Sequence, residues 1–161
     1  MTSEETAVSV GHTDSWCAPA KPLDDQELSA ALTNSAAPAW SVRAGAGRRL
    51  AAAALTDELV DMLLRLLLDP DDTAVTQDTA EALLKRGDTT GLRCVLMALS
   101  RVTTTCTMDH LWDALDGNPA WMTDEGTNRL IKQLRELTTD HDTGVRAEAN
   151  NILETLRLSG A

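Results

Sequence analysis

The sequence contains no phenylalanine and no tyrosine, and its four tryptophans are its only large aromatic residues. Its apolar residues are mainly Leu, Ala, Val and Met. β-Sheet proteins normally use aromatic and β-branched side chains. Ala and Leu are good helix formers, and the small Ala side chain lets helices approach closely. The composition therefore excludes an all-β fold and predicts an all-α protein.

Basic residues are scarce, because 14 Lys and Arg stand against 25 Asp and Glu and give a net charge of −11. Proteins bind nucleic acids largely by neutralising phosphates with Lys and Arg. We therefore expect no nucleic-acid partner. An acidic surface favours solubility and attracts basic partners, so the expected partner is a protein or peptide, possibly a basic one.

Cysteines and long apolar runs are also few. The three cysteines show no paired spacing, which indicates neither a disulfide framework nor a zinc motif. No segment approaches the roughly 18 apolar residues of a membrane span, and the first residues lack the pattern of a secretory signal. We expect a cytoplasmic protein with reduced thiols and no membrane partner. Its Ala, Arg, Asp and Thr content suggests a bacterial genome of high GC content.

The chain divides into two parts. Residues 1–22 show no apolar periodicity and are predicted to form a disordered or loosely docked tail. Trp16 in this tail either packs back onto the first helices or serves as a short binding motif. Residues 23–161 are predicted to form one helical domain.

Internal repeats organise the predicted domain. Four nine-residue segments, which start at Val42, Val75, Thr107 and Val145, each begin with a β-branched residue and carry Leu eight positions later. Their spacings of 33, 32 and 38 residues are typical of two-helix repeats. Apolar stripes between them predict the partner helices at residues 24–32, 56–68, 90–102 and 124–137.

An acidic turn, Val-Arg-x-x-Ala and a Leu eight residues after the Val together resemble the second helix of a HEAT repeat. The best match is the segment 142–149, Asp-Thr-Gly-Val-Arg-Ala-Glu-Ala. The resemblance covers residues 24–158, although Thr76 and Met108 replace the Arg and Thr107 replaces the Val. It implies a short right-handed α-solenoid of about four HEAT-like antiparallel helix pairs.

In HEAT-like stacks the second helices line the concave side, which is the usual contact surface. With Val75, Thr79, Ala82 and Leu83 facing the core of the second unit, the positions one, two and six residues after each start point outward. These outward positions are Arg43, Ala44, Arg48, Thr76, Gln77, Glu81, Asp109, Asp113, Arg146, Ala147 and Asn151.

The third unit has the most distinctive composition. Residues 102–128 contain no Lys or Arg but hold Asp109, Asp113, Asp116, Asp124 and Glu125. The same stretch includes two tryptophans and Met122; Trp is the residue most enriched at interface hot spots, and Met adapts to irregular surfaces. Trp121 either reaches outside the domain or caps a helix pair, whereas Trp40 and Trp112 are expected to pack between units. The predicted partner-binding residues are Arg43, Arg48, Gln77, Glu81, Asp109, His110, Trp112, Asp113, Trp121, Met122, Arg146 and Asn151.

No catalytic residue, cofactor or metal is predicted. Cys106, His110 and Asp113 share one helical face, but a zinc ion needs a fourth ligand. The sequence lacks a nucleophile elbow, a catalytic triad and a phosphate-binding loop.

These observations favour a non-enzymatic adaptor that binds a partner protein through the concave face and the third repeat. One alternative is an immunity or inhibitor protein that neutralises a basic toxin or enzyme. A second is an accessory protein or enzyme that acts on a small molecule near Cys106, His110 and Trp112. A third is a structural subunit that self-associates through one helix pair. We expect a monomer or a weak homo-oligomer.

Overall fold

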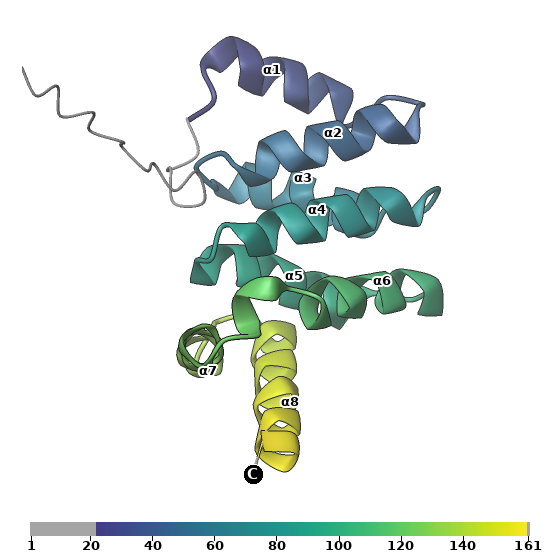
Figure 1. Cartoon of the computed structure of the whole chain (residues 1–161). Helices are drawn as coiled ribbons and strands as arrows, with labels where there is room; N and C mark the ends of the chain where they lie inside the picture. The colour runs from purple at the N-terminus through teal and green to yellow at the C-terminus, as the bar shows by residue number, and fades with distance from the viewer. Residues whose placement is uncertain (1–21, 161) are drawn as a thin grey trace, which may run out of the picture.

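The computed structural model describes residues 22–160, and this part of the chain contains helices and no strands, which confirms the all-α prediction (Figure 1). The predicted tail lies outside the described residues except for Pro22. None of the helices in the described part is long and apolar enough to cross a membrane. The helices are α1 (Asp25–Asn34), α2 (Trp40–Ala51), α3 (Asp57–Leu67), α4 (Thr73–Lys85), α5 (Thr89–Arg101), α6 (Thr105–Asp116), the 3-10 helix η1 (Pro119–Trp121), α7 (Asp124–Leu137) and α8 (Thr143–Gly160).

Short polar turns set the helix boundaries. Gly87 adopts a φ of 72°, a left-handed conformation that suits glycine at a helix end. Asp88 then accepts a hydrogen bond from the Gly91 backbone N–H at 2.8 Å and starts α5. Asp142 accepts one from the Val145 N–H at 3.0 Å in the same way. Gly87 and Asp88 therefore form the boundary between α4 and α5, and Asp142 caps the start of α8.

The second helices of the first three pairs pack in one row, in which α4 lies between α2 and α6 (Figure 1). Close approach of α2 and α4 depends on Gly47, because a Cβ atom there would lie 2.1 Å from Thr79 Oγ1. On the other side α3 packs against α5, and the fully buried side chains include Leu63, Leu83 and Leu96. The core lies between these two groups of helices.

The third pair has the same register as the second. Thr107, Leu111, Ala114 and Leu115 are buried in α6, as Val75, Thr79 and Leu83 are in α4. The replacement of Val by Thr at the start of this unit thus leaves its register unchanged.

The fourth pair departs from the row. Helix α8 packs on α5 and α7, and it runs across the direction of α2, α4 and α6 (Figure 1). A Cβ atom at Gly144 would lie 2.4 Å from Ser100 Oγ, which shows how closely the start of α8 approaches α5. As a result α8 does not follow α6 in the way that α6 follows α4.

Several predicted exposures are wrong. Arg43, Ala44 and Thr76 were predicted to point outward, but their exposed fractions are 8%, 1% and 0%. These positions would face outward in an isolated helix pair, but α2, α4 and α6 pack directly on one another and bury one flank of each covered helix. Trp40 was expected to pack between units, but at the first position of α2 it is 48% exposed.

Candidate binding surface

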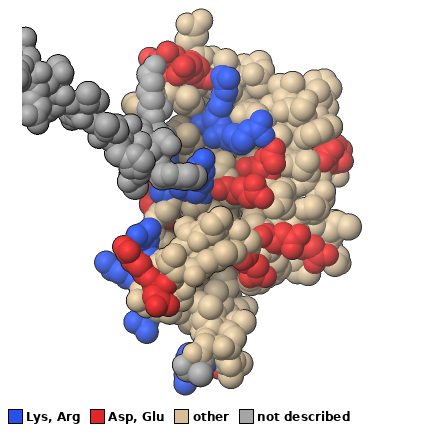
Figure 2. Space-filling model, viewed as in Figure 1, with Lys and Arg blue, Asp and Glu red and all other residues tan. Residues whose placement is uncertain are grey.

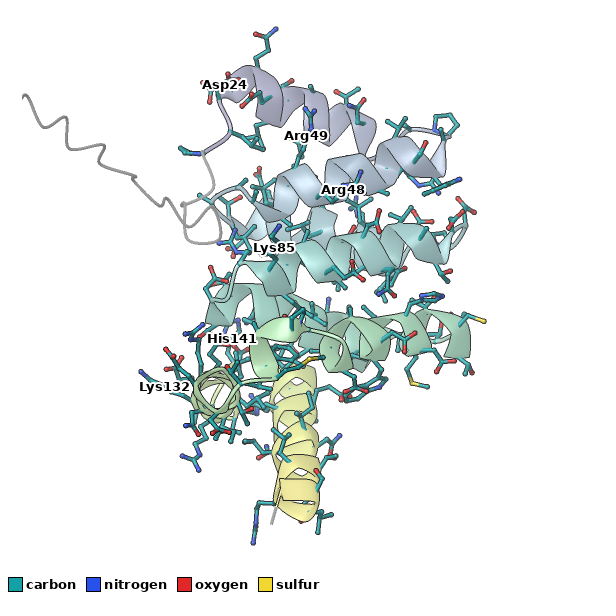
Figure 3. All side chains as sticks on the ribbon, in the orientation of Figure 1. Asp24, Arg48, Arg49, Lys85, Lys132 and His141 are labelled. Atoms are coloured by element: carbon teal, nitrogen blue, oxygen red, sulfur yellow. The ribbon has the colours of Figure 1, made fainter. Side chains whose placement is uncertain are left out.

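One face of the row carries half of the predicted binding residues. We call it the α2–α4–α6 face, and its exposed or half-buried residues are Arg48, Gln77, Asp78, Glu81, Asp109, His110 and Asp113. Basic atoms gather over α2 and acidic atoms over α4 and α6 (Figure 2). Figure 3 shows Arg48 and Arg49 on α2 and Lys85 at one end of α4. The face therefore changes sign from α2 to α6.

Polar contacts connect the three helices of this face. Arg48 forms an ion pair with Asp78, which joins α2 to α4. His110 Nδ1 donates to Gln77 Oε1 over 3.0 Å, and Gln77 Nε2 donates to Glu81 Oε1 over 2.6 Å. The structure thus brings together the predicted residues Gln77 and Glu81 of α4 and His110 of α6.

Two carboxylates on α6 are free of these contacts. Asp109 and Asp113 are exposed, and neither is paired with a basic side chain among the described residues. Since they lie one helical turn apart, both are available on the same side of α6. Among the predicted residues of this face, they are exposed carboxylates without a basic partner in the described part of the chain.

Arg43 is not part of the binding surface. Its Nε donates to Asp69 Oδ2 over 2.8 Å and its Nη2 to Asp69 Oδ1 over 3.1 Å. Its Nη1 donates to the carbonyl oxygens of Ala37 and Pro38. Burial raises the pKa of Asp69, but the hydrogen bonds from Arg43 and from two backbone N–H groups outweigh it and leave this pKa below its ordinary value. Arg43 therefore fixes two turns of the scaffold.

Arg146 repeats part of this arrangement in the fourth pair. Its Nη1 donates to the carbonyl oxygen of Asp140 over 2.6 Å, six residues earlier in the chain, as Arg43 does to Ala37. Arg146 is half-buried and Asn151 is exposed on α8. Because α8 does not pack beside α6, the structure does not place these two predicted residues in the row that forms the α2–α4–α6 face.

The two tryptophans of the third repeat belong to a groove beside α6. Trp112 and Trp121 are half-buried and pack against the core, so of the two alternatives for Trp121 the structure shows the capping one. The carbonyl oxygen of Trp121 also accepts a hydrogen bond from Thr127 Oγ1 at 2.9 Å. Met122 is 73% exposed next to it. The groove, called the α6 groove below, has a volume of about 180 Å³ and is lined by Trp112, Leu115, Asp116, Trp121, Thr127, Leu130, Ile152 and Leu156.

Sequence reasoning missed the part of this groove that comes from the fourth pair. Ile152 and Leu156 continue the apolar stripe that begins with Val145 and Ala149 in α8. Val145 and Ala149 are fully buried, whereas Ile152 and Leu156 are only partly covered. The stripe was visible in the sequence, but its partial exposure depends on the direction of α8.

A wider cleft of about 600 Å³ lies between the α1–α2 turn and the α3–α4 turn. Arg43 and Asp69 line it, but they are engaged with each other. Arg65 and Asp71 supply its other charges. This cleft therefore offers a binding partner fewer unpaired groups than the α2–α4–α6 face.

Cys106, His110 and Asp113 all lie on α6. His110 contacts Gln77, and Cys106 is an exposed free thiol. Within residues 22–160 no group of three or more His, Cys, Asp or Glu side chains is placed to hold a metal ion. Cys94 is buried on α5, and burial raises the pKa of its thiol to about 11.

Comparison with known proteins gives no relative on which these assignments can draw. The chain matches no protein-family model, no curated protein and no solved structure. The candidate surface is therefore defined by its own geometry and charge.

Proposed function

We propose that this protein is a non-enzymatic binding module built as a short right-handed α-solenoid of HEAT-like helix pairs. Its partner is a protein or peptide with a basic surface. The partner binds the α2–α4–α6 face, with its basic groups toward α6. The observation that carries this proposal is the presence of exposed Asp109 and Asp113 on a helix without Lys or Arg, held in a row with Glu81.

Two features of the described structure support the HEAT-like part of the proposal. The second helices of three successive pairs lie side by side. In addition, Arg43 and Arg146 stand at the same position of the repeated Val-Arg-Ala pattern and donate to a carbonyl oxygen six residues earlier. A shared contact at matching positions is expected if the units are structural repeats.

The charge arrangement supports a basic partner. Asp78 is neutralised by Arg48, so the net negative field of the face comes mainly from its α6 side. Complementary charge accelerates association and orients the encounter, and added salt weakens both effects. The contact between Gln77 and His110 adds fixed polar groups between the charged positions.

The proposal is tested by site-specific photo-crosslinking. A photoreactive amino acid at Asp113 is expected to capture a partner in cells, whereas the same amino acid at the exposed Asp57 of α3 is not. The double variant D109K/D113K should lose capture of that partner, while the matched double charge reversal D57K/E58K should retain it. Equal capture from positions 113 and 57, or equal capture by both charge variants, would contradict the proposal.

The identity of the captured partner also separates an adaptor from an inhibitor. If the partner is a basic toxin or enzyme, its activity can be assayed with and without this protein. Inhibition that is lost in D109K/D113K would assign the inhibitor function. Capture without inhibition would assign the adaptor function.

A further inference from the structure

The α6 groove lies where a further helix of the row is missing. In α2, the flank that faces α4 carries Arg43, Gly47 and Ala51, and all three are buried. In α4, the corresponding residues are Thr76, Ala80 and Leu84, which are buried as well. The flank of α2 is covered by α4, and the flank of α4 is covered by α6.

The corresponding flank of α6 is uncovered. Its residues are Met108, Trp112 and Asp116, of which Met108 is 37% exposed, Trp112 is half-buried and Asp116 is exposed. Gly47 and Ala80 are small enough for the next helix to pack directly above them. Trp112 at the same position instead forms one wall of the α6 groove. The turned α8 contributes Ile152 and Leu156 to the lining of the same groove.

We propose that the α6 groove binds an amphipathic helix of a partner protein. This helix lies beside α6, where a fourth helix would continue the row of α2, α4 and α6. This inference rests on the proposed protein-binding function and assigns it a second contact surface. Helix α6 has 12 residues, so the bound helix would run along roughly 18 Å, or about three turns. Its apolar side chains insert between Trp112, Trp121 and Leu156.

Charge identifies the chemistry of the bound helix. Asp116 lines the groove, Asp113 precedes it by three residues on α6, and residues 102–128 contain no Lys or Arg. A helix with an acidic border would be repelled here, whereas Lys or Arg beside its apolar stripe would face both carboxylates. The partner segment is therefore a helix with an apolar stripe and at least one basic border. Docking an apolar helical face into a groove is an established mode of peptide recognition.

The test uses the full chain and a fluorescein-labelled synthetic peptide of about 14 residues, which forms roughly four turns of helix. The peptide has Leu and Ala at every third and fourth position and Lys on both borders. A control peptide has the same composition, but its Leu and Ala are scattered so that they form no stripe. Fluorescence anisotropy should give a dissociation constant at least about tenfold lower for the striped peptide.

Matched variants locate the binding site. D116K and W112A should each raise the dissociation constant of the striped peptide by about tenfold or more. E81K on the α2–α4–α6 face and D57K on α3 should change it by less than about twofold. D116K replaces an exposed residue, so the test does not depend on how well W112A folds, which circular dichroism reports.

Three results would overturn the inference. The first is equal binding of the striped and scattered peptides, and the second is binding that neither D116K nor W112A weakens. The third is a photo-crosslink from position 116 to residues 1–21 or to a second copy of the chain, because the occupant would then be this protein itself.

The second result has one informative form. If E81K weakens binding and neither D116K nor W112A does, the proposed α2–α4–α6 face retains its function and only the groove is refuted.

Discussion

Arg93 of α5 holds Asp140 of the α7–α8 turn through two hydrogen bonds, Nε to Oδ2 over 2.7 Å and Nη2 to Oδ1 over 3.1 Å. In the second pair, the first carboxylate of the corresponding turn is Asp69, and its partner is Arg43 of α2. The α3–α4 turn is thus bound by α2, the second helix of the first pair. The α7–α8 turn is bound instead by α5, the first helix of the third pair. This change of partner accompanies the turned direction of the fourth pair.

Replacing Arg93 with Met should destabilise the protein. The Asp140 side chain is 11% exposed and would lose its only bidentate partner among the described residues. We expect the free energy of unfolding to fall by about 1–3 kcal/mol, measured by urea denaturation. The control is R157M, which removes an exposed Arg whose side chain is 83% accessible, and its effect should be below about 0.5 kcal/mol. Equal losses in the two variants would contradict this role of Arg93.

Stability should fall in acid because three turn carboxylates titrate at low pH. Hydrogen bonds from Arg93 lower the pKa of Asp140, and the backbone N–H of Val145 lowers that of Asp142. The pKa of Asp69 is lowered too, as described above. Between these lowered values and the ordinary pKa of about 3.9, the unfolded chain binds more protons than the folded one. The stabilisation is therefore complete above about pH 5 and is lost progressively as the pH falls below about 4.

Denaturation at a series of pH values tests this dependence. D140N should be less stable at pH 7 and should lose less stability between about pH 5 and pH 3 than the wild type. D61N replaces an exposed carboxylate and should keep the wild-type slope. An unchanged slope in D140N would show that Asp140 contributes nothing to the acid sensitivity.

Two glycines of α2 should respond in opposite ways to replacement by Ala. At Gly47, the new Cβ would meet Thr79 Oγ1 at 2.1 Å, so G47A should destabilise the fold despite the better helix propensity of Ala. At Gly45 the nearest atom is Arg48 Nη2 at 3.7 Å, and G45A should stabilise by up to about 1 kcal/mol. T79A should recover part of the loss in G47A, because it removes the clashing hydroxyl. Additive effects of G47A and T79A in thermal denaturation would argue against this contact.

The cysteines should differ in reactivity. The thiolate is the reactive form, and burial raises the pKa of Cys94 to about 11. At pH 8 iodoacetamide should modify the exposed Cys106 at least about a hundredfold faster than Cys94. Peptide mass spectrometry resolves the two sites, and modification in guanidinium should remove the difference. Rapid alkylation of Cys94 in the folded protein would show that α5 is less protected than its burial indicates.

Local sequence patterns predicted most of the helices. The apolar stripes of α3 and α7 and the caps Asp88 and Asp142 report interactions within a few residues, which the sequence displays directly. Even the third unit, with its changed signature, keeps its register because Leu111 and Leu115 preserve the helical spacing. These elements depend on periodicity, and periodicity needs no knowledge of neighbouring helices.

The surface was predicted less well because it depends on how the pairs pack. Arg43 has the sequence pattern of an outward residue, but Asp69, 26 residues later, receives its side chain inside the scaffold. The count of 25 Asp and Glu also overstated the number of carboxylates free to meet a partner, since Asp69, Asp88, Asp140 and Asp142 are engaged in turns and caps. The α6 groove could not be foreseen, because it arises from the direction of α8 relative to α6.

Helix α5 gives the molecule a centre that a linear row of repeats would lack. It contacts α3, α4, α6, α7 and α8, and its buried residues run from Gly91 and Leu92 through to Leu99. In a row where each unit touches only its neighbours, the last unit has one neighbour and frays first. Here, loss of α8 would expose α5, which also contacts α3 and α4 of the second pair and α6 of its own pair. We therefore expect α8 to melt together with α5 and the helices that contact it, rather than to fray first.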